Sequence, residues 1–270
     1  MTIMTILSHR FFRPGNCGRA SVLSFLACIM LGSAAHASDV TTFKSGRDTL
    51  HAELFLPDTG KAPWPAVIVI HEWWGVNDQV RDEAKSFTKL GYAALVIDLY
   101  RGRSARDTDE AHELSRGLPE DRAIGDLRAA FRYLRSRRDI RREAIGSVGY
   151  CLGGGYSLAL ATAEPNLAAC AVYYGRLITE EARLRKIKAP VIGFFGEDDR
   201  GISPSSVREF EARMKRLKKK IIVEIYPGAG HAFANATRSS YRPGAAGDAR
   251  KKLEEFFGKY LPARKRSIPK

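Results

Sequence analysis

The chain is short of cysteine and has no apolar run long enough to cross a membrane. It has four cysteines among 270 residues, and two of them, Cys17 and Cys28, lie in the first 37 positions. So few cysteines exclude a scaffold held together by several disulfides. Cys170 lies in an apolar segment typical of a buried strand, where a free cysteine behaves as a small hydrophobic residue. We therefore expect no disulfide and a free thiol at Cys151.

The N-terminus has a composition of its own. Residues 1–20 contain three arginines and no acid, residues 21–31 are apolar, and Ala35-His36-Ala37 follows as a small-x-small site. This order is typical of a secretory signal peptide, whereas the alternative, an uncleaved membrane anchor, needs about 20 apolar residues. We predict a signal peptide at 1–37 that is removed after Ala37, and hence a periplasmic or secreted protein. The remainder, 38–270, is predicted to form one domain without a membrane span.

Acidic residues are outnumbered, with 30 Asp and Glu against 44 Lys and Arg and a formal net charge of +14. This balance raises the hypothesis of a nucleic-acid or anionic-membrane partner. The basic runs 135–142 and 213–220 lie at the ends of predicted helices, where cations favour the helix dipole, and the run 263–270 is a chain terminus. No aromatic residues interleave with these runs, and no nucleic-acid motif is present. We interpret the excess as a solvated basic surface and expect no nucleic-acid partner.

Apolar runs alternate with amphipathic segments along the rest of the chain, which has no internal repeat. Strands are predicted at 41–45, 49–56, 66–70, 93–97, 144–150, 168–174, 191–195 and 221–226. Helices are predicted at 78–90, 119–137, 153–163, 180–187, 203–217 and 245–260. This alternation predicts one α/β domain with a mostly parallel sheet and helices on both faces. Residues 99–118 are polar and show no clear period, so we predict a loop or lid there.

A glycine-rich turn carries the strongest catalytic signal. The predicted strand 144–150 runs directly into Cys151 and then into a helix of small residues. Gly149-Tyr150-Cys151-Leu152-Gly153 has the small-x-nucleophile-x-small pattern of a nucleophile elbow, with cysteine where serine is usual. The helix behind it aims N–H groups and a positive dipole end at the sulfur, which favours a thiolate and an oxyanion. We predict a nucleophile at Cys151; the alternative is a structural Gly-Cys-Gly turn.

Two later loops supply the partners that such a nucleophile needs. In nucleophile-elbow hydrolases the acid and then the histidine follow the nucleophile, each on a loop after a strand. Asp199 lies in the carboxylate-rich turn after strand 191–195, and His231 follows strand 221–226 between small residues. Asp199 is preferred over Asp198 because the acid usually stands three residues after the glycine of this turn. We predict that Asp199 and His231 complete a catalytic triad.

The first buried strand ends in the run His71-Glu72-Trp73-Trp74-Gly75-Val76-Asn77. We expect this loop to face the elbow, so that the N–H groups of Trp73 and Leu152 form an oxyanion hole. Glu72 offers a second acid–base group, the alternative being a solvated surface carboxylate. His71 and Glu72 are not a zinc motif, because no histidine follows three residues later. No metal and no cofactor are predicted.

These motifs resemble those of the dienelactone hydrolases (carboxymethylenebutenolidases) from about residue 40 to residue 260. The matching runs are 71–77, 98–100, 149–154, 196–199 and 230–233. The resemblance implies the α/β-hydrolase fold and a Cys151–His231–Asp199 triad, with Glu72 contacting the resting thiol and taking part in its activation. It also implies hydrolysis of an enol-lactone to an oxo-acid.

The sequence departs from this family at two positions. The catabolic members hold the substrate carboxylate with two arginines, and Gly102 and Asn235 occupy those places here. Arg101 or Arg103 could take the first place, and nothing obvious takes the second. An export signal also differs from a cytoplasmic catabolic role. The resemblance therefore supports the chemistry more firmly than a dienelactone substrate.

The predicted function is hydrolysis of an activated ester or lactone of small-molecule size, with a monomer favoured. The residues expected to contact substrate are Trp73, Trp74, Tyr100, Arg101, Arg103 and Phe233. Two alternatives remain at this point. One is a thiol redox or sensor protein, which would need a resolving partner for Cys151. The other is a non-catalytic binding protein on the same scaffold.

Overall fold

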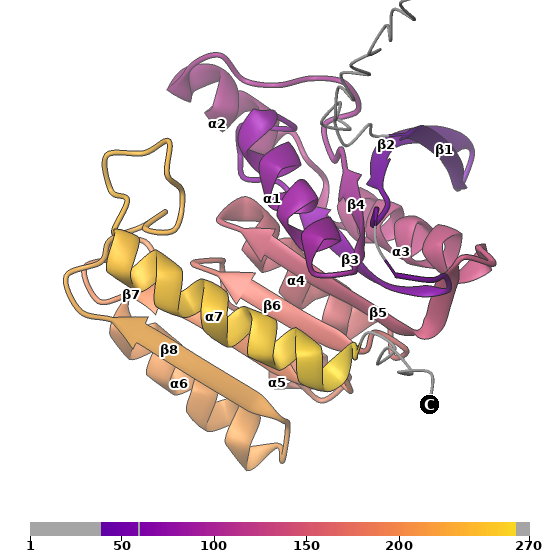
Figure 1. The fold of residues 1–270 in the computed structure, drawn as a ribbon. Coiled ribbons are helices and arrows are strands. Elements are labelled where there is room, and N and C mark those ends of the chain that lie inside the picture. Colours follow the sequence, from indigo (N-terminus) through magenta and orange to yellow (C-terminus); the bar gives the residue numbers. More distant parts are fainter. Residues whose placement is uncertain (1–38, 59, 263–270) are drawn as a thin grey trace, which may run out of the picture. The chain divides into compact units, whose positions relative to one another are not determined.

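Eight strands form one sheet in the order β1-β2-β4-β3-β5-β6-β7-β8 (Figure 1). The computed structural model describes residues 39–58 and 60–262. The strands are β1 (Asp39–Ser45), β2 (Asp48–Phe55), β3 (Trp64–Ile70), β4 (Ala93–Ile97), β5 (Ile140–Tyr150), β6 (Ala169–Tyr173), β7 (Val191–Gly196) and β8 (Ile221–Tyr226). The helices are α1 (Asp78–Lys89), α2 (Thr108–Arg116), α3 (Glu120–Ser136), α4 (Leu152–Ala163), α5 (Glu181–Leu184), α6 (Pro204–Arg216) and α7 (Pro243–Tyr260).

Most of the sheet is parallel. β3 pairs in parallel with β4 and with β5, and β6, β7 and β8 then add in parallel, each to the strand before it. β1 and β2 form an antiparallel hairpin at the opposite side of the sheet from β8. There, β2 pairs antiparallel with β4. The predicted hairpin and the mostly parallel sheet of an α/β-hydrolase fold are therefore confirmed.

Each face of the sheet has its own hydrophobic core, because side chains alternate between the faces along a strand. Ile68 and Ile70 of β3 belong to a cluster with residues of α3, α4 and α6. Val67 and Val69 belong to a second cluster with residues of α1 and α7. Figure 1 shows α1 and α7 in front of the sheet and α3 to α6 behind it. Burial on both faces explains why the parallel strands are continuous apolar runs.

The prediction of a loop or lid at 99–118 needs one correction, because helix α2 occupies the second half of this segment. The Asp107 side chain caps α2 by accepting a hydrogen bond from the N–H of Glu110 at 2.9 Å. Only Ala111 and Leu114 of this helix are buried, too few to give a clear apolar period. The first half of the segment is attached to the loop after β3 by a hydrogen bond from Ala105 N–H to the carbonyl of Trp74 at 2.9 Å.

The predicted signal peptide, residues 1–37, lies outside the described residues. Within 39–58 and 60–262, none of the helices has both the length and the apolar character that a membrane crossing requires.

Candidate active site

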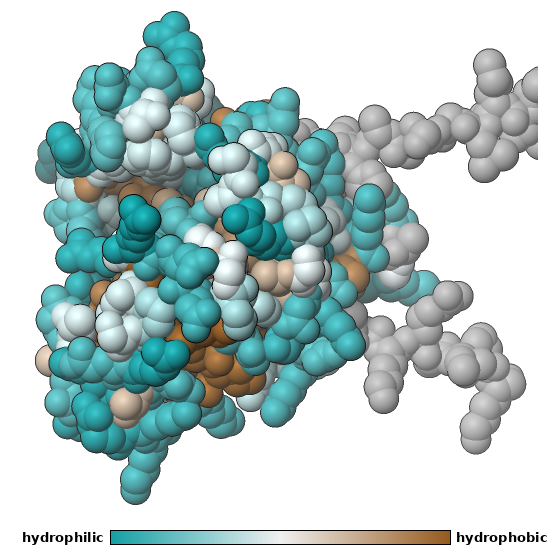
Figure 2. All heavy atoms as spheres, turned by 90° about the vertical axis from the view of Figure 1, so that its left-hand side faces the viewer, coloured by the Kyte–Doolittle hydropathy of each residue, from teal (hydrophilic) through white to brown (hydrophobic). Residues whose placement is uncertain are grey.

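The parallel strands all end on the same side of the sheet. The loops that follow them therefore meet at the edge formed by the C-terminal ends of these strands. The loops after β3, β5, β6, β7 and β8 carry Glu72, Cys151, Tyr174, Asp199 and His231 at this edge. Figure 2 looks onto it and shows hydrophobic side chains in hollows of a mostly hydrophilic surface. In open α/β sheets, ligands bind outside the carboxyl ends of the strands. The active site is therefore expected at this edge.

Cys151 lies at a strained turn between β5 and α4. Its φ of 54° and ψ of −113° are a backbone conformation that residues with side chains seldom adopt. The turn has no room for side chains at its flanking glycines. A Cβ on Gly153 would lie 2.6 Å from the carbonyl oxygen of His71, and one on Gly149 would collide with the carbonyl of Gly153. The tight approach of α4 to β5 and β3 explains why the elbow needs small residues.

The loops after β7 and β8 place Asp199 and His231 against Cys151. His231 Nε2 lies 3.0 Å from Cys151 Sγ, and its Nδ1 lies 2.7 Å from Asp199 Oδ2. The other carboxylate oxygen of Asp199 accepts hydrogen bonds from the N–H groups of Gly201 and Ile202. Asp198 is exposed, so the structure brings Asp199 rather than its neighbour to the histidine. The three predicted residues thus form one hydrogen-bonded row.

The ionisation of these groups follows from their contacts. Burial would by itself raise the pKa of Asp199, but its bonds from His231 and from two backbone N–H groups hold that pKa below its usual range. Burial would likewise lower the pKa of His231. Its hydrogen bonds to Asp199 and Cys151 outweigh that effect and raise the pKa to about 10. A protonated imidazole is therefore favoured between the sulfur and the carboxylate at neutral pH.

Glu72 is buried beside this row rather than solvated. Tyr174 donates to its Oε1 from 3.4 Å, and the side-chain amide of Asn235 donates to its Oε2 from 3.0 Å. Burial raises the pKa of Glu72, and these two donors, together with the charges of Arg238 and His231, partly oppose that rise. Asn235, where the resemblance leads one to expect an arginine, thus donates to Glu72 as a neutral group.

A buried histidine fixes the loop that carries Glu72. Burial lowers the pKa of His71, which favours its neutral form. Nε2 accepts a hydrogen bond from Leu99 N–H at 3.1 Å, so Nδ1 carries the proton and donates to the Glu72 carbonyl at 2.5 Å. The side chain of His71 thereby connects the loop after β3 to the segment that follows β4 and restricts the movement of this loop.

The predicted oxyanion hole has its two N–H groups at the ends of β3 and β5. Leu152 is the first residue of α4, so its N–H has no partner within the helix. Among the described hydrogen bonds between backbone groups outside helices and strands, neither Leu152 nor Trp73 donates. Neither N–H therefore has a backbone partner in the described part of the chain, and their role as an oxyanion hole stays a prediction.

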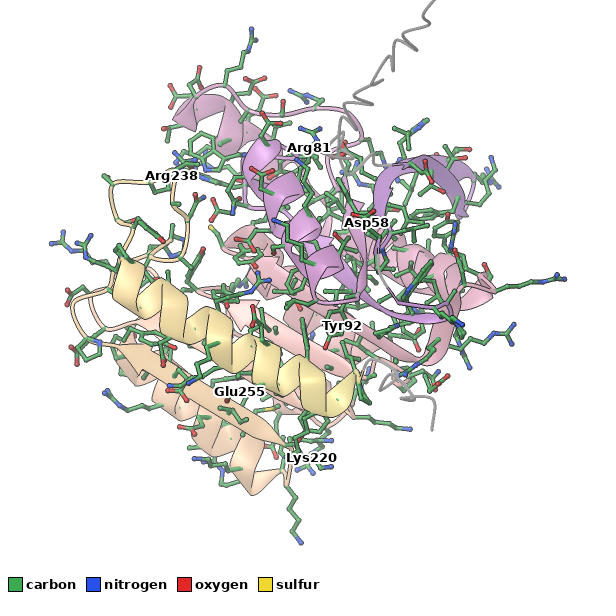
Figure 3. The ribbon with its side chains drawn as sticks, in the orientation of Figure 1. Asp58, Arg81, Tyr92, Lys220, Arg238 and Glu255 are labelled. Atoms are coloured by element: carbon green, nitrogen blue, oxygen red, sulfur yellow. The ribbon has the colours of Figure 1, made fainter. Side chains whose placement is uncertain are left out.

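The side chains of the loop after β3 pack in an aromatic row. Trp73 contacts Trp74 at 5.1 Å between ring centroids and His112 of α2 at 4.8 Å. The guanidinium of Arg238 lies over the ring of Trp74 at 4.0 Å. Figure 3 shows Arg238 on the loop between β8 and α7. Arg238 thus brings a cation to the Glu72 side of the site.

Three of the side chains expected to contact substrate have partners within the chain. Phe233 is fully buried and packs on the rings of Tyr174 and Tyr226. It therefore holds the Tyr174 ring in place from the protein interior. Arg101 pairs with Asp48 and Asp126, and Arg103 pairs with Glu113. Both arginines are therefore paired with carboxylates of the chain itself. Burial excludes a direct substrate contact at Phe233, whereas contact of Arg101 and Arg103 with substrate stays a prediction.

Tyr100 is placed differently. It is buried, its ring contacts His71, and its hydroxyl has no hydrogen-bond partner among the described residues. Its pKa is raised above the usual range by burial and then by the nearby Tyr156 and Cys151 groups. The Tyr100 hydroxyl is therefore a buried polar group without a partner in the described chain, and its contact with substrate stays a prediction.

A cavity of about 380 Å³ begins beside Leu152. Its walls come from the start of α4, from the segment after β6 and from the junction of α2 and α3. Among its lining residues are Leu118, Leu152, Tyr156, Arg176 and Ile178. The cavity gives the elbow a neighbouring space of ligand size.

Sequence patterns missed Tyr174 and Arg238. Tyr174 directly follows β6 at the same edge as the other functional loops, and its position at a strand end could have identified it. Arg238 lies in an irregular loop whose course no local pattern specifies, so no signal pointed to it. No group of three or more metal-ligating side chains occurs in the part of the chain that the structure describes.

The chain is similar to known proteins over nearly all of this architecture. The model of the dienelactone hydrolase family matches residues 50–261. A Bradyrhizobium sp protein described as a "Probable 2-oxo-3-(5-oxofuran-2-ylidene)propanoate lactonase" is 32% identical over 198 residues, which cover 68% of this chain and 79% of that protein. A provisionally named carboxymethylenebutenolidase of Yersinia pestis is 30% identical over 232 residues, 80% of this chain and 86% of its own.

A solved structure shows the same relationship. The crystal structure of a provisionally named dienelactone hydrolase from Klebsiella pneumoniae subsp. pneumoniae superposes with a TM-score of 0.77 at 25% identity. The match covers 83% of this chain and 99% of that one. The family model covers the chain from within β2 to the end of α7, which includes the elbow and the loops described above. This chain belongs to the dienelactone hydrolase family of α/β hydrolases.

Proposed function

We propose that this chain hydrolyses an activated ester or lactone by way of a thioester on Cys151. Membership of the family makes it a hydrolase of esters or lactones. The observation that carries the finer proposal is the 3.0 Å contact of His231 Nε2 with the sulfur of a strained elbow, with Asp199 behind the histidine.

The first half of the reaction transfers the acyl group to sulfur. The Cys151 thiolate attacks the carbonyl carbon, and the carbonyl electron pair moves to oxygen, which the N–H groups of Leu152 and Trp73 hold. The carbon–oxygen bond to the leaving group then breaks. The leaving oxygen takes the proton from His231 Nε2, which leaves a thioester and a neutral imidazole.

The second half returns the enzyme to its starting state. Neutral His231 takes a proton from water as the water oxygen attacks the thioester carbon, and collapse of the intermediate expels the Cys151 thiolate. Asp199 holds the imidazole in the required tautomer and stabilises its charged form. The sum is ester plus water giving acid plus alcohol.

Sulfur as nucleophile restricts the leaving group. A thiolate is expelled from a tetrahedral intermediate more readily than an ordinary alkoxide, so a simple alkyl ester returns to substrate. An enolate or phenolate competes with the thiolate and departs. The account therefore favours enol-lactones and aryl esters over amides and alkyl esters.

The departures at Gly102 and Asn235 bear on the substrate. Arg101 and Arg103 are engaged by carboxylates, whereas Arg238 stacks on Trp74 and has no ion pair among the described residues. In this proposal a carboxylate group on the acyl part of the substrate pairs with the guanidinium of Arg238.

The sequence at 1–37 supports export as part of this proposal. Expression in a Gram-negative host with fractionation tests it directly. We expect a periplasmic product whose first residue is Ser38, and an intact N-terminus retained in the cytoplasm would reject the export proposal while leaving the chemistry untouched.

A substrate panel tests the chemistry. Aryl esters, ethyl esters of the same acids and enol-lactones are compared on wild type, Cys151→Ala, Cys151→Ser and Cys170→Ser. We expect aryl ester and enol-lactone turnover well above ethyl ester turnover, a loss of at least about 10³-fold in Cys151→Ala, and little change in Cys170→Ser. Full activity in Cys151→Ala would reject the proposal.

The same panel separates the alternatives. A binding protein would show no turnover with any member. A redox thiol protein would form a reversible oxidised state at Cys151, but Cys170, the second thiol of the described chain, is buried in β6 against Ser157. No observation favours either alternative over hydrolysis.

A further inference from the structure

The sheet edge opposite the active site is strongly basic. Parallel strands also begin side by side, and the segments leading into β4, β5, β7 and β8 all bring cations to that edge. The exposed cations there are Lys89, Arg135, Arg138, Arg142, Lys186, Lys188, Arg216, Lys218 and Lys220. We call this set the basic edge. Figure 3 shows Lys220 extending away from the start of β8, whereas Arg238 lies at the opposite edge.

These cations are not neutralised by neighbouring acids. None of them has an ion pair or side-chain hydrogen bond in the described part of the chain. Acids in the segments around the starts of β5 and β6 are engaged: Asp139 pairs with Arg137, Glu143 lies 3.6 Å from Arg141, and Glu164 is buried and accepts from Asn166. Net positive charge therefore remains at the surface of this edge.

Helix dipoles explain only part of the set. Lys89, Arg135 and Arg216 belong to the last turns of α1, α3 and α6, where a cation is favoured in any helix. Arg142 lies in β5, and Lys186, Lys188 and Lys220 lie beyond the ends of their helices. Neighbouring strands are about 4.8 Å apart, so the starts of β5 to β8 span roughly 14 Å. The charge is spread over a surface rather than confined to one helix end.

Exposed aliphatic side chains accompany the cations. The structure has three exposed large hydrophobic residues in its described part, and two of them, Leu90 and Ile222, are close in sequence to Lys89 and Lys220. Cations beside exposed aliphatic groups fit the interface of a bilayer, where charge meets headgroups and apolar side chains meet the acyl boundary. Single-stranded nucleic acid is bound largely by aromatic stacking, and the basic edge contains no aromatic residue.

We propose that the basic edge docks this protein on a bilayer surface of anionic headgroups, with the active site facing away from the membrane. The solvated basic surface expected from sequence becomes an interaction surface once the fold gathers its runs on one edge. Cys151 and His231 lie at the other end of the strands and stay open to soluble substrate in the docked state. The described residues end at Pro262, and the sequence continues with Arg264, Lys265, Arg266 and Lys270.

Vesicle binding of the full chain tests this proposal. Wild type is mixed with phosphatidylcholine vesicles, with or without 30% phosphatidylglycerol, at low and at high salt, and bound protein is measured by co-sedimentation. The edge variant is K186E/K188E/K220E. The matched control is R47E/R116E/R208E, which changes net charge equally at exposed arginines without ion pairs in the described chain. All three proteins share residues 1–38 and 263–270, so those segments cannot cause a difference.

We expect wild type and the control to bind the anionic vesicles, and binding to weaken at high salt. The edge variant should lose more than about tenfold in affinity, because each basic residue near an anionic surface contributes measurably. Unchanged aryl ester hydrolysis by the edge variant would show that it is folded. Equal losses in both variants, or equal binding to neutral vesicles, would overturn the proposal. Binding to duplex DNA without binding to vesicles would also overturn it and assign the edge to nucleic acid.

Discussion

Three residues from separate loops determine what the sulfur of Cys151 can do. The thiol sits at a strained φ, His231 lies at hydrogen-bond distance, and Asp199 is fixed by two backbone N–H groups. Sequence order and spacing predicted all three residues, because the nucleophile elbow and its partner loops have local signatures. What the sequence could not supply is the set of neighbours drawn from other loops, such as Tyr174 and Asn235 on Glu72.

The carboxylate of Asp199 is expected to control the protonation of His231. Asp199→Asn removes the contact that raises the pKa of the imidazole, so kcat for an aryl ester should fall by about 10²- to 10⁴-fold. The adjacent, exposed Asp198→Asn is the matched control and should retain activity. Stopped-flow and steady-state kinetics measure both. A similar loss of kcat in the two variants would contradict a specific role of Asp199 in the protonation of His231.

Glu72 is expected to set the acid limb of the pH profile. Burial raises its pKa, so a step that needs its carboxylate form should fail as pH falls through a value above that of a surface glutamate. Glu72→Gln keeps the shape but cannot titrate, and its amide oxygen can accept from only one of the two donors, Tyr174 and Asn235. In kcat/KM against pH, we expect the wild-type acid limb to disappear in this variant, at lower overall activity. An unchanged acid limb would exclude Glu72 from the activation of Cys151.

At the scale of elements, the elbow depends on the close approach of α4 to β3. Gly153→Ala would place a Cβ 2.6 Å from the His71 carbonyl oxygen. This atom belongs to the backbone, so it cannot move away without distorting the loop after β3. We expect a loss of about 1–3 kcal/mol in the free energy of unfolding, with activity reduced further because Cys151 moves. Gly247→Ala in α7 meets no atom within 4 Å and should stabilise by about 0.5–1 kcal/mol. Urea unfolding compares the two, and equal effects would contradict this packing account.

Elements with strong apolar periods could be predicted from sequence, and those without could not. β3 and β4 are continuous apolar runs, because both of their faces are buried. α2 was missed because it buries only Ala111 and Leu114 and otherwise lies in solvent. The substrate-contact prediction failed at Phe233 because burial behind Tyr174 depends on how β6 and β8 lie relative to each other. Local patterns carry no information about such a distance.

At the scale of the whole molecule, the active-site charges affect stability as well as catalysis. The folded-state pKa of His231 is about 10 against an ordinary value of 6.5, so the folded protein holds this proton more tightly than the unfolded chain. That stabilisation is fully present below about pH 6.5 and is lost as pH rises through about 10. The free energy of unfolding of wild type should therefore decline relative to His231→Gln over this range. Parallel curves for the two proteins would contradict the shift.

The central claim is that substrate is covalently held on Cys151 during turnover. Wild type and Cys151→Ala are mixed with an aryl ester, quenched with acid within milliseconds and digested, and the peptide spanning 143–176 is analysed by mass spectrometry. The account predicts an acyl adduct that fragmentation locates on Cys151 rather than Cys170, that hydroxylamine removes, and that is absent in Cys151→Ala. Turnover at the normal rate with no adduct on Cys151 at any quench time, and with activity retained in Cys151→Ala, would contradict it.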